Sequence, residues 1–288
     1  MKYSRALALS FFSLLILTLN FLFPPDTVKP ASADGDAVLP ILMYHQVLDK
    51  ADKLGKYVVS PRELEADLRL LSEQGYETVT IRDLVDFSEG KRALPKKSVM
   101  LTFDDGYQTD YLNVFPLLKK YNMKAVFSVV GTYTERYSTP GIDKHINYAH
   151  LSWNEISEMQ ESGLCEFQNH SYNLHSLTDR HGALQISGEA ENDYLGIVHN
   201  DLKTSQKLLT GKLGAPPLCF TYPYGGTNEL LRKLVPDEGF AASLGTYEQI
   251  NVLTGDSSEL FDLRRFNRAH GRNIKKILEK AEKLRSRG

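Results

Sequence analysis

The chain is poor in cysteine, with only Cys165 and Cys219 among 288 residues, each inside an apolar segment. Two cysteines without a framework spacing exclude a small disulfide-stapled domain, and we expect both to be buried as small apolar side chains. Long basic blocks are also missing and the net charge is −2, so nothing predicts nucleic-acid binding. No internal repeat or low-complexity tract is present, which favours one folded domain.

Only the N-terminus carries a long hydrophobic run. Basic residues precede an apolar stretch over residues 6–23, a pair of prolines ends it, and Ala-Ser-Ala at 31–33 fits a small-residue cleavage site. We predict that residues 1–33 are a secretory signal peptide. The alternative is an uncleaved N-terminal membrane anchor, because the run is just long enough to span a bilayer. Residues 34–288 are then secreted or attached to the extracellular face of the cell membrane.

Composition and pattern beyond that run are those of an enzyme domain. The chain is 42% hydrophobic and 24% charged, and the mature part has about the size of one α/β barrel. Capping boxes at Ser60 and Ser152 predict helices that end near Gly75 and Gly163. Strands are predicted at 38–45, 77–81, 99–103, 125–130, 164–169, 218–221 and 241–244. Strands alternating with helices imply a parallel sheet, open or closed.

Two segments far apart in the chain carry the residues of a metal site. Thr102-Phe-Asp-Asp-Gly106 ends one apolar strand in two carboxylates, and His170-Ser-Tyr-Asn-Leu-His175 follows another with two imidazoles. Two histidines with one or two carboxylates form a ligand set for a divalent transition metal with open positions. Five residues turn a helix by about 140°, so the histidines would not share a helical face. We therefore place them at a strand end and in the loop after it.

At these residues the chain resembles the polysaccharide deacetylases, the NodB-homology family or carbohydrate esterase family 4. The resemblance implies that Asp104 is the general base and that Asp105, His170 and His175 bind the metal. The histidine motif is one residue longer than the common form and is similar to that of the deacetylases of biofilm poly-β-1,6-N-acetylglucosamine. Thr221-Tyr-Pro-Tyr-Gly225 also resembles that subgroup, since the wider family has an arginine before the Pro-Tyr segment.

The resemblance also implies a general acid and an oxyanion donor. In the subgroup a Tyr-His pair near the mature N-terminus supplies the acid, which here is His45 in Leu42-Met-Tyr-His-Gln-Val47. The rival is His270, because a late histidine does this work in the wider family. Tyr224 is expected to aim its backbone N–H at the developing oxyanion. The remaining histidines, His145, His150, His181 and His199, are expected to be solvated.

The implied fold is a single α/β domain, a distorted barrel of about seven parallel strands. The implied activity is N-deacetylation of an N-acetylglucosamine polymer with release of acetate, using Zn²⁺, or else Co²⁺, Ni²⁺ or Fe²⁺. Peptidoglycan and chitin oligomers are alternative substrates. The ligand set also allows an Fe(II) oxygenase, although α/β alternation argues against it, and the fold allows a non-catalytic carbohydrate-binding protein. The residues 133–150 are predicted to form a loop beside the site. The basic helix expected over 275–287 packs on the body or touches a membrane surface.

Overall fold

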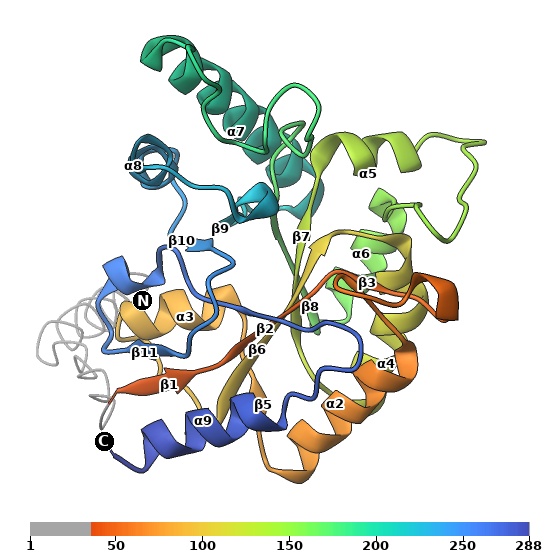
Figure 1. The fold of residues 1–288 in the computed structure, drawn as a ribbon, viewed down its shortest axis with the longest axis vertical. Helices are drawn as coiled ribbons and strands as arrows, with labels where there is room; N and C mark the ends of the chain where they lie inside the picture. The colour runs from red at the N-terminus through yellow and green to blue at the C-terminus, as the bar shows by residue number, and fades with distance from the viewer. Residues whose placement is uncertain (1–35, 288) are drawn as a thin grey trace, which may run out of the picture. The chain divides into compact units, whose positions relative to one another are not determined.

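Seven parallel strands follow one another across the main sheet of the computed structural model, which describes residues 36–287 (Figure 1). Their order is β10, β9, β8, β7, β6, β2 and β12, and a short β5 pairs with the start of β6. The bounds are β2 Ile41–Tyr44, β5 Glu77–Thr78, β6 Ser98–Asp105, β7 Ala125–Val129, β8 Cys165–Asn169, β9 Cys219–Thr221, β10 Ala242–Leu244 and β12 Phe266–Asn267. An isolated parallel bridge joins Leu244 of β10 to Leu263, in the segment that leads to β12. The expected distorted barrel of about seven parallel strands is confirmed.

The strand predictions differ from the structure in several places. The segment expected as one strand over 38–45 divides at Pro40 into β1 (Ala37–Leu39) and β2, and β1 pairs antiparallel with β11 (Asn251–Leu253). Proline lacks the N–H that a continuous ladder needs. The strand expected over 77–81 keeps only β5, because Ile81 already begins a helix. β12 was not predicted, since two residues are too short to show a period.

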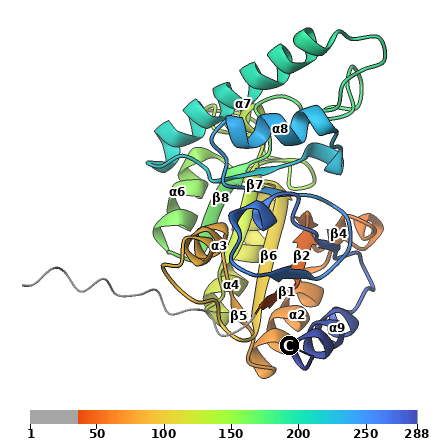
Figure 2. The same ribbon diagram turned by 90° about the vertical axis from the view of Figure 1, so that its left-hand side faces the viewer.

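The helices alternate with the strands along the chain and lie around the sheet (Figures 1 and 2). Their bounds are α2 Pro61–Glu73, α3 Ile81–Ser88, α4 Phe115–Tyr121, α5 Gly131–Tyr137, α6 Trp153–Glu161, α7 Glu191–Leu213, α8 Glu229–Asp237 and α9 Lys275–Arg285. The capping boxes at Ser60 and Ser152 are both formed, as predicted. The loop expected over 133–150 is wrong in its first part, which is the end of α5.

Shorter elements complete the described residues. β3 (Gln46–Val47) pairs in parallel with β4 (Val58–Val59), and a π-helical turn spans Asp110–Val114. Short 3₁₀ turns lie at Ala51–Lys53, Pro223–Gly225 and Ser257–Leu260. The signal peptide predicted at residues 1–33 lies outside the described residues. None of the helices between residues 36 and 287 has the length and apolar character that a membrane crossing requires.

The alternation of β6 separates an apolar side from a side that turns polar at the carboxyl end. Leu101 and Phe103 join the large core cluster that also holds α2, α4 and α9. Met100 joins a second cluster with α3. Because side chains alternate along a strand, Thr102 and Asp104 lie on the same side as Met100. Buried residues of α9, among them Ile277 and Leu278, pack in the large core, which confirms packing of this helix on the body.

Candidate active site

Asp105, His170 and His175 come together at the carboxyl ends of the central strands. Nε2 of His175 lies 3.0 Å from Oδ1 of Asp105, and Nε2 of His170 lies 3.4 Å from the same oxygen. One ligand atom from each residue lies within 4.8 Å of the others. The structure thus brings the three predicted metal ligands into one cluster.

The backbone at the end of β6 turns so that Asp104 and Asp105 serve the same region. Asp105 has φ 72° and Gly106 has φ 65°, both in the left-handed region that L side chains rarely adopt. A Cβ on Gly106 would lie 2.8 Å from Cγ1 of Val129, on the neighbouring strand. Only glycine fits there, and the turn that it permits breaks the alternation that would put the two carboxylates on opposite faces.

Hydrogen bonds shape the loop that carries the two histidines. The Asn169 side chain accepts from the N–H of Ser171, whose φ is 79°. The next two backbone N–H groups both donate to the Asp201 carboxylate on α7, at 2.8 Å each. This clamp curls the chain after β8, which lets His170 and His175 point at one carboxylate although five residues separate them.

The ligand atoms suit a divalent transition metal. Nδ1 of His170 lies 2.8 Å from the carbonyl oxygen of Thr221, which can only accept, so Nδ1 carries the proton and Nε2 presents its lone pair. Burial acts to raise the pKa of Asp105, but the neighbouring imidazoles of His170 and His175 outweigh burial and hold the pKa well below its usual range. A neutral imidazole and an ionised carboxylate are the forms that bind metal.

Asp104 is held by a buried arginine from the far end of the sequence. Two nitrogens of Arg265 lie 2.7 and 2.8 Å from the two carboxylate oxygens of Asp104, and both side chains are almost fully buried. Arg265 also donates to the hydroxyl of Thr102 and to the carbonyl of Gly245. Burial acts to raise the pKa of Asp104, and the charge of Arg265 more than offsets it. Asp104 is therefore ionised and fixed in orientation at neutral pH.

His45 and His270, the two candidates for the general acid, have different surroundings. His45 follows β2, and its pKa is lowered by burial and raised in part by the charges of Asp105 and Asp104, which lie near it. Its Nδ1 is buried without a protein partner in the described residues. His270 is 47% exposed, and its Nδ1 lies 2.9 Å from the Glu63 carboxylate at the start of α2.

Aromatic side chains form the wall of the site around His175. Tyr224, which has φ 57°, places its ring 4.4 Å from that of His175, and its hydroxyl lies 3.3 Å from His175 Nδ1. Tyr133 of α5 donates to the His175 carbonyl. Tyr224 is 40% exposed and therefore lies at the mouth of the site, with its ring against the predicted metal ligand His175.

Residues 91–243, just over half of the chain, match the family model described as polysaccharide deacetylase. The chain belongs to the polysaccharide deacetylase family. The resemblance seen in the sequence motifs is thereby confirmed.

Members of this family with curated names are similar along most of the chain. Poly-β-1,6-N-acetyl-D-glucosamine N-deacetylase of Staphylococcus aureus strain MSSA476 is 27% identical over 254 residues, which are 80% of this chain and 81% of that protein. The protein of the same name from Escherichia coli K12 is 29% identical over 230 residues, 71% of this chain. This chain spans about a third of the length of that relative, 34%. The solved structure of a de-N-acetylase from Aggregatibacter actinomycetemcomitans has a TM-score of 0.72 at 25% identity, covering 84% of this chain and 99% of that one.

Two polar residues of this polysaccharide deacetylase fold were misread or missed from sequence. Arg265 was missed because it has no local signature: its contact with Asp104 joins residues 161 positions apart. His150, expected to be solvated, is buried. Its Nδ1 lies 2.9 Å from the carbonyl oxygen of Asp105, and its ring stacks on Tyr107 and contacts Tyr133. Through this hydrogen bond His150 holds the backbone of the turn at Asp105 in place.

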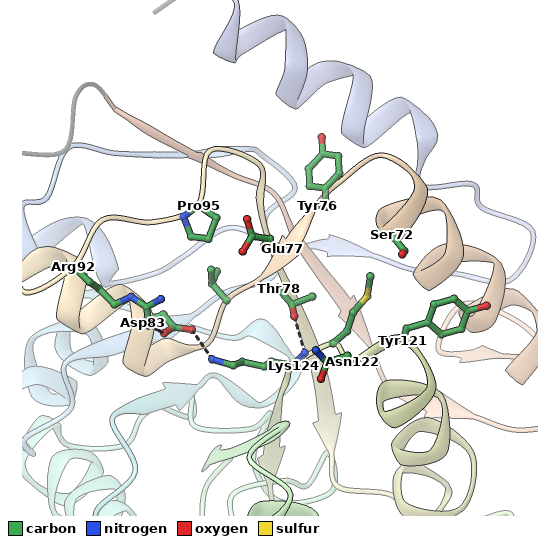
Figure 3. A pocket seen from close by; sticks show the side chains of 12 residues that line it. Ser72, Tyr76, Glu77, Thr78, Asp83, Arg92, Pro95, Tyr121, Asn122 and Lys124 are labelled. Atoms are coloured by element: carbon green, nitrogen blue, oxygen red, sulfur yellow. Dashed lines mark hydrogen bonds and ion pairs between the residues drawn. The ribbon is translucent and has the colours of Figure 1, made fainter.

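A separate hollow lies at the opposite end of the sheet, where strands begin (Figure 3). There Asp83 of α3 lies between Arg92 and Lys124, and the Lys124 backbone N–H donates to the Thr78 hydroxyl at 2.6 Å. These contacts tie α3 to the strand starts. The cluster of Asp105, His170 and His175 lies at the other edge, where parallel α/β folds place their chemistry.

Proposed function

We propose that this protein is a metal-dependent hydrolase that removes acetyl groups from N-acetylglucosamine units of an extracellular polysaccharide, poly-β-1,6-N-acetylglucosamine in the first instance. The main support for the proposal is that two adjacent carboxylates have different surroundings. Asp105 lies beside two histidines, and Asp104 forms an ion pair with Arg265. The names of the Staphylococcus aureus and Escherichia coli relatives support the β-1,6 linkage of the proposed substrate.

Asp105, His170 and His175 would hold the divalent ion, and the nitrogen-rich set favours Zn²⁺. Co²⁺, Ni²⁺ and Fe²⁺ fit the same donors. When bound, such an ion lowers the pKa of a coordinated water and polarises a carbonyl. Metal analysis of protein purified without added metal tests the assignment, because one equivalent that is lost in a His170→Ala variant supports it.

Each remaining group has one task in the reaction. Asp104, ionised and fixed by Arg265, accepts a proton from the water that attacks the acetamide carbon. The N–H of Tyr224 donates to the oxygen on which negative charge develops. His45 gives a proton to the sugar nitrogen as the C–N bond breaks. The products are acetate and a glucosamine unit.

His45 is the preferred acid because it lies near both carboxylates, whereas Glu63 holds His270 at the surface. The same geometry bears on the oxygenase and carbohydrate-binding alternatives. An ionised carboxylate that is free of the ligand cluster has a use in hydrolysis, and a pure binder or an oxygenase does not need it.

The test is acetate release by the purified protein from β-1,6-linked N-acetylglucosamine oligomers, with chelator and with metal restored. We expect release that chelator abolishes and a divalent ion restores. Release only from chitin oligomers or peptidoglycan would move the proposal to those substrates. If no glycan releases acetate with any metal but the protein binds a glycan, the carbohydrate-binding alternative holds.

We also propose that residues 1–33 direct the chain out of the cell, either as a cleaved signal or as an anchor, so that residues 34–288 act at the extracellular surface. The proposal is supported by the apolar run at 6–23 and by the extracellular nature of the proposed substrate. N-terminal sequencing of the protein from culture fractions tests it. A mature terminus at residue 34 indicates cleavage, and an intact terminus in the membrane fraction indicates an anchor.

A further inference from the structure

His150 is a buried histidine that has no part in the proposed reaction. It lies at the end of the loop that joins α5 to α6. Its Nδ1 lies 2.9 Å from the carbonyl oxygen of Asp105. Because a carbonyl oxygen can only accept, Nδ1 carries the proton and donates a hydrogen bond to the backbone of a predicted metal ligand.

Residues 149–151 pair with the turn that carries Asp105. Two backbone hydrogen bonds of 2.8 Å join this segment to Gly106 and Gln108. The ring of His150 adds a third bond, and it is the one of the three that reaches Asp105 itself. The segment therefore holds the turn at several successive residues, and the histidine side chain supplies the contact nearest to the carboxylate.

The turn needs this support because Asp105 has φ 72°, a conformation that residues other than glycine rarely adopt. Residues held in such conformations persist where the surrounding contacts over-determine them. The peptide group before Asp105 lies within β6, and the carbonyl after it accepts from His150. The backbone is thus fixed on both sides of the carboxylate that faces the two histidine ligands.

His150 is also linked to the loop that carries His175. The ring centres of His150 and Tyr133, a residue of α5, are 4.5 Å apart. The Tyr133 hydroxyl donates to the carbonyl of His175 at 2.9 Å, and the Tyr133 ring lies edge-on to the His175 ring with their centres 6.0 Å apart. One imidazole therefore contacts the backbone of Asp105 directly and that of His175 through a single tyrosine.

We propose that His150 is a positioning residue of the candidate metal centre. It is not one of the three ligands. It holds the backbones of Asp105 and His175 so that their ligand atoms lie 3.0 Å apart before an ion binds, and this preorganisation raises the metal affinity. The inference rests on the proposed function, because it takes Asp105 and His175 as metal ligands.

The experiment measures the affinity of the purified protein for Zn²⁺ by competition with a chromophoric chelator, without substrate. We expect His150→Phe, which keeps an aromatic ring but loses the Nδ1 donor, to bind the ion about tenfold more weakly, as when other partners that orient metal ligands are lost. His150→Asn should bind more tightly than His150→Phe, because its amide nitrogen can take the place of Nδ1. His145→Phe is the matched control, since His145 lies in the same loop, is exposed and stacks on Tyr148.

A second variant tests the link to the other ligand-bearing loop. Tyr133→Phe keeps the ring and removes only the hydroxyl that donates to the carbonyl of His175. We expect it to weaken Zn²⁺ binding in the same direction as His150→Phe. We also expect both variants to change the visible absorption of the Co²⁺-loaded protein, which reports the geometry of the ligands, while His145→Phe leaves that spectrum as in the parent.

The outcomes separate this inference from the proposed function. Parent-like Zn²⁺ affinity in His150→Phe overturns the inference, and acetate release by the parent would then still support the proposed function. Equal affinities of His150→Asn and His150→Phe overturn it too, because the donated hydrogen bond would have no effect. If His150→Phe does not fold, parent-like affinity of Tyr133→Phe is the overturning result. If the parent binds no divalent ion, the proposed function fails, and the inference fails with it.

Discussion

Replacing Arg265 by methionine tests how the Asp104 carboxylate is held. Arg265 is fully buried, and it forms two charged hydrogen bonds with Asp104 and one each with Thr102 and Gly245. Methionine is of similar length but has no donor, so a nearly fully buried carboxylate loses its cation. Removal of one partner from a buried ion pair costs about 3–5 kcal/mol.

That cost is a large share of a typical unfolding free energy of about 5–15 kcal/mol. We expect Arg265→Met to remain folded in dilute buffer but to unfold at a much lower denaturant concentration, and kcat to fall by about a hundredfold or more, because the proposed base loses its orientation. Denaturant unfolding followed by circular dichroism, together with acetate release, measures both effects. Arg69→Met on the surface of α2 is the control.

A double variant separates the charge from the packing. In Asp104→Leu combined with Arg265→Met no buried charge remains in the pair, so a good part of the lost unfolding free energy should return, while activity stays absent. The reasoning is refuted if Arg265→Met unfolds at the same denaturant concentration as the parent and keeps the parent's kcat. The pair would then neither stabilise the fold nor orient the base.

Three further predictions follow from other contacts. His45→Gln should lower kcat by about a hundredfold or more while His270→Gln keeps near-parent activity, and the reverse ranking in acetate-release assays would transfer the acid role to His270. Gly106→Ala should destabilise the fold in a thermal melt, since φ is +65° and the new Cβ would lie 2.8 Å from Val129; a parent-like melting temperature would contradict this. Burial acts to raise the pKa of Glu63, but hydrogen bonds from Ser60, Gly271 and His270 lower it to about 2. Glu63 therefore stabilises the fold above its unfolded pKa of about 4.3, and this contribution is lost as the pH falls towards 2. Glu63→Gln should flatten that part of the stability–pH curve, and an unchanged slope would count against it.

The amino-acid sequence determined those parts of the site that depend on short segments. Apolar runs fixed the central strands, and Asp105 and His170 come directly after such runs, so their meeting at one edge follows from parallel pairing alone. Capping boxes likewise placed the starts of α2 and α6, because each box is satisfied within four consecutive residues. These features need no knowledge of distant neighbours.

Tertiary structure alone decided the rest. Arg265 reaches Asp104 across 161 positions, from beside a two-residue strand that has no period of its own. The buried ring of His150 packs against Tyr107, Tyr133 and Tyr137, which come from three separate segments or turns of the chain. In each case the partner is chosen by the folding of the whole sheet, and a local pattern cannot encode a contact whose energy arises only when distant segments exclude water together.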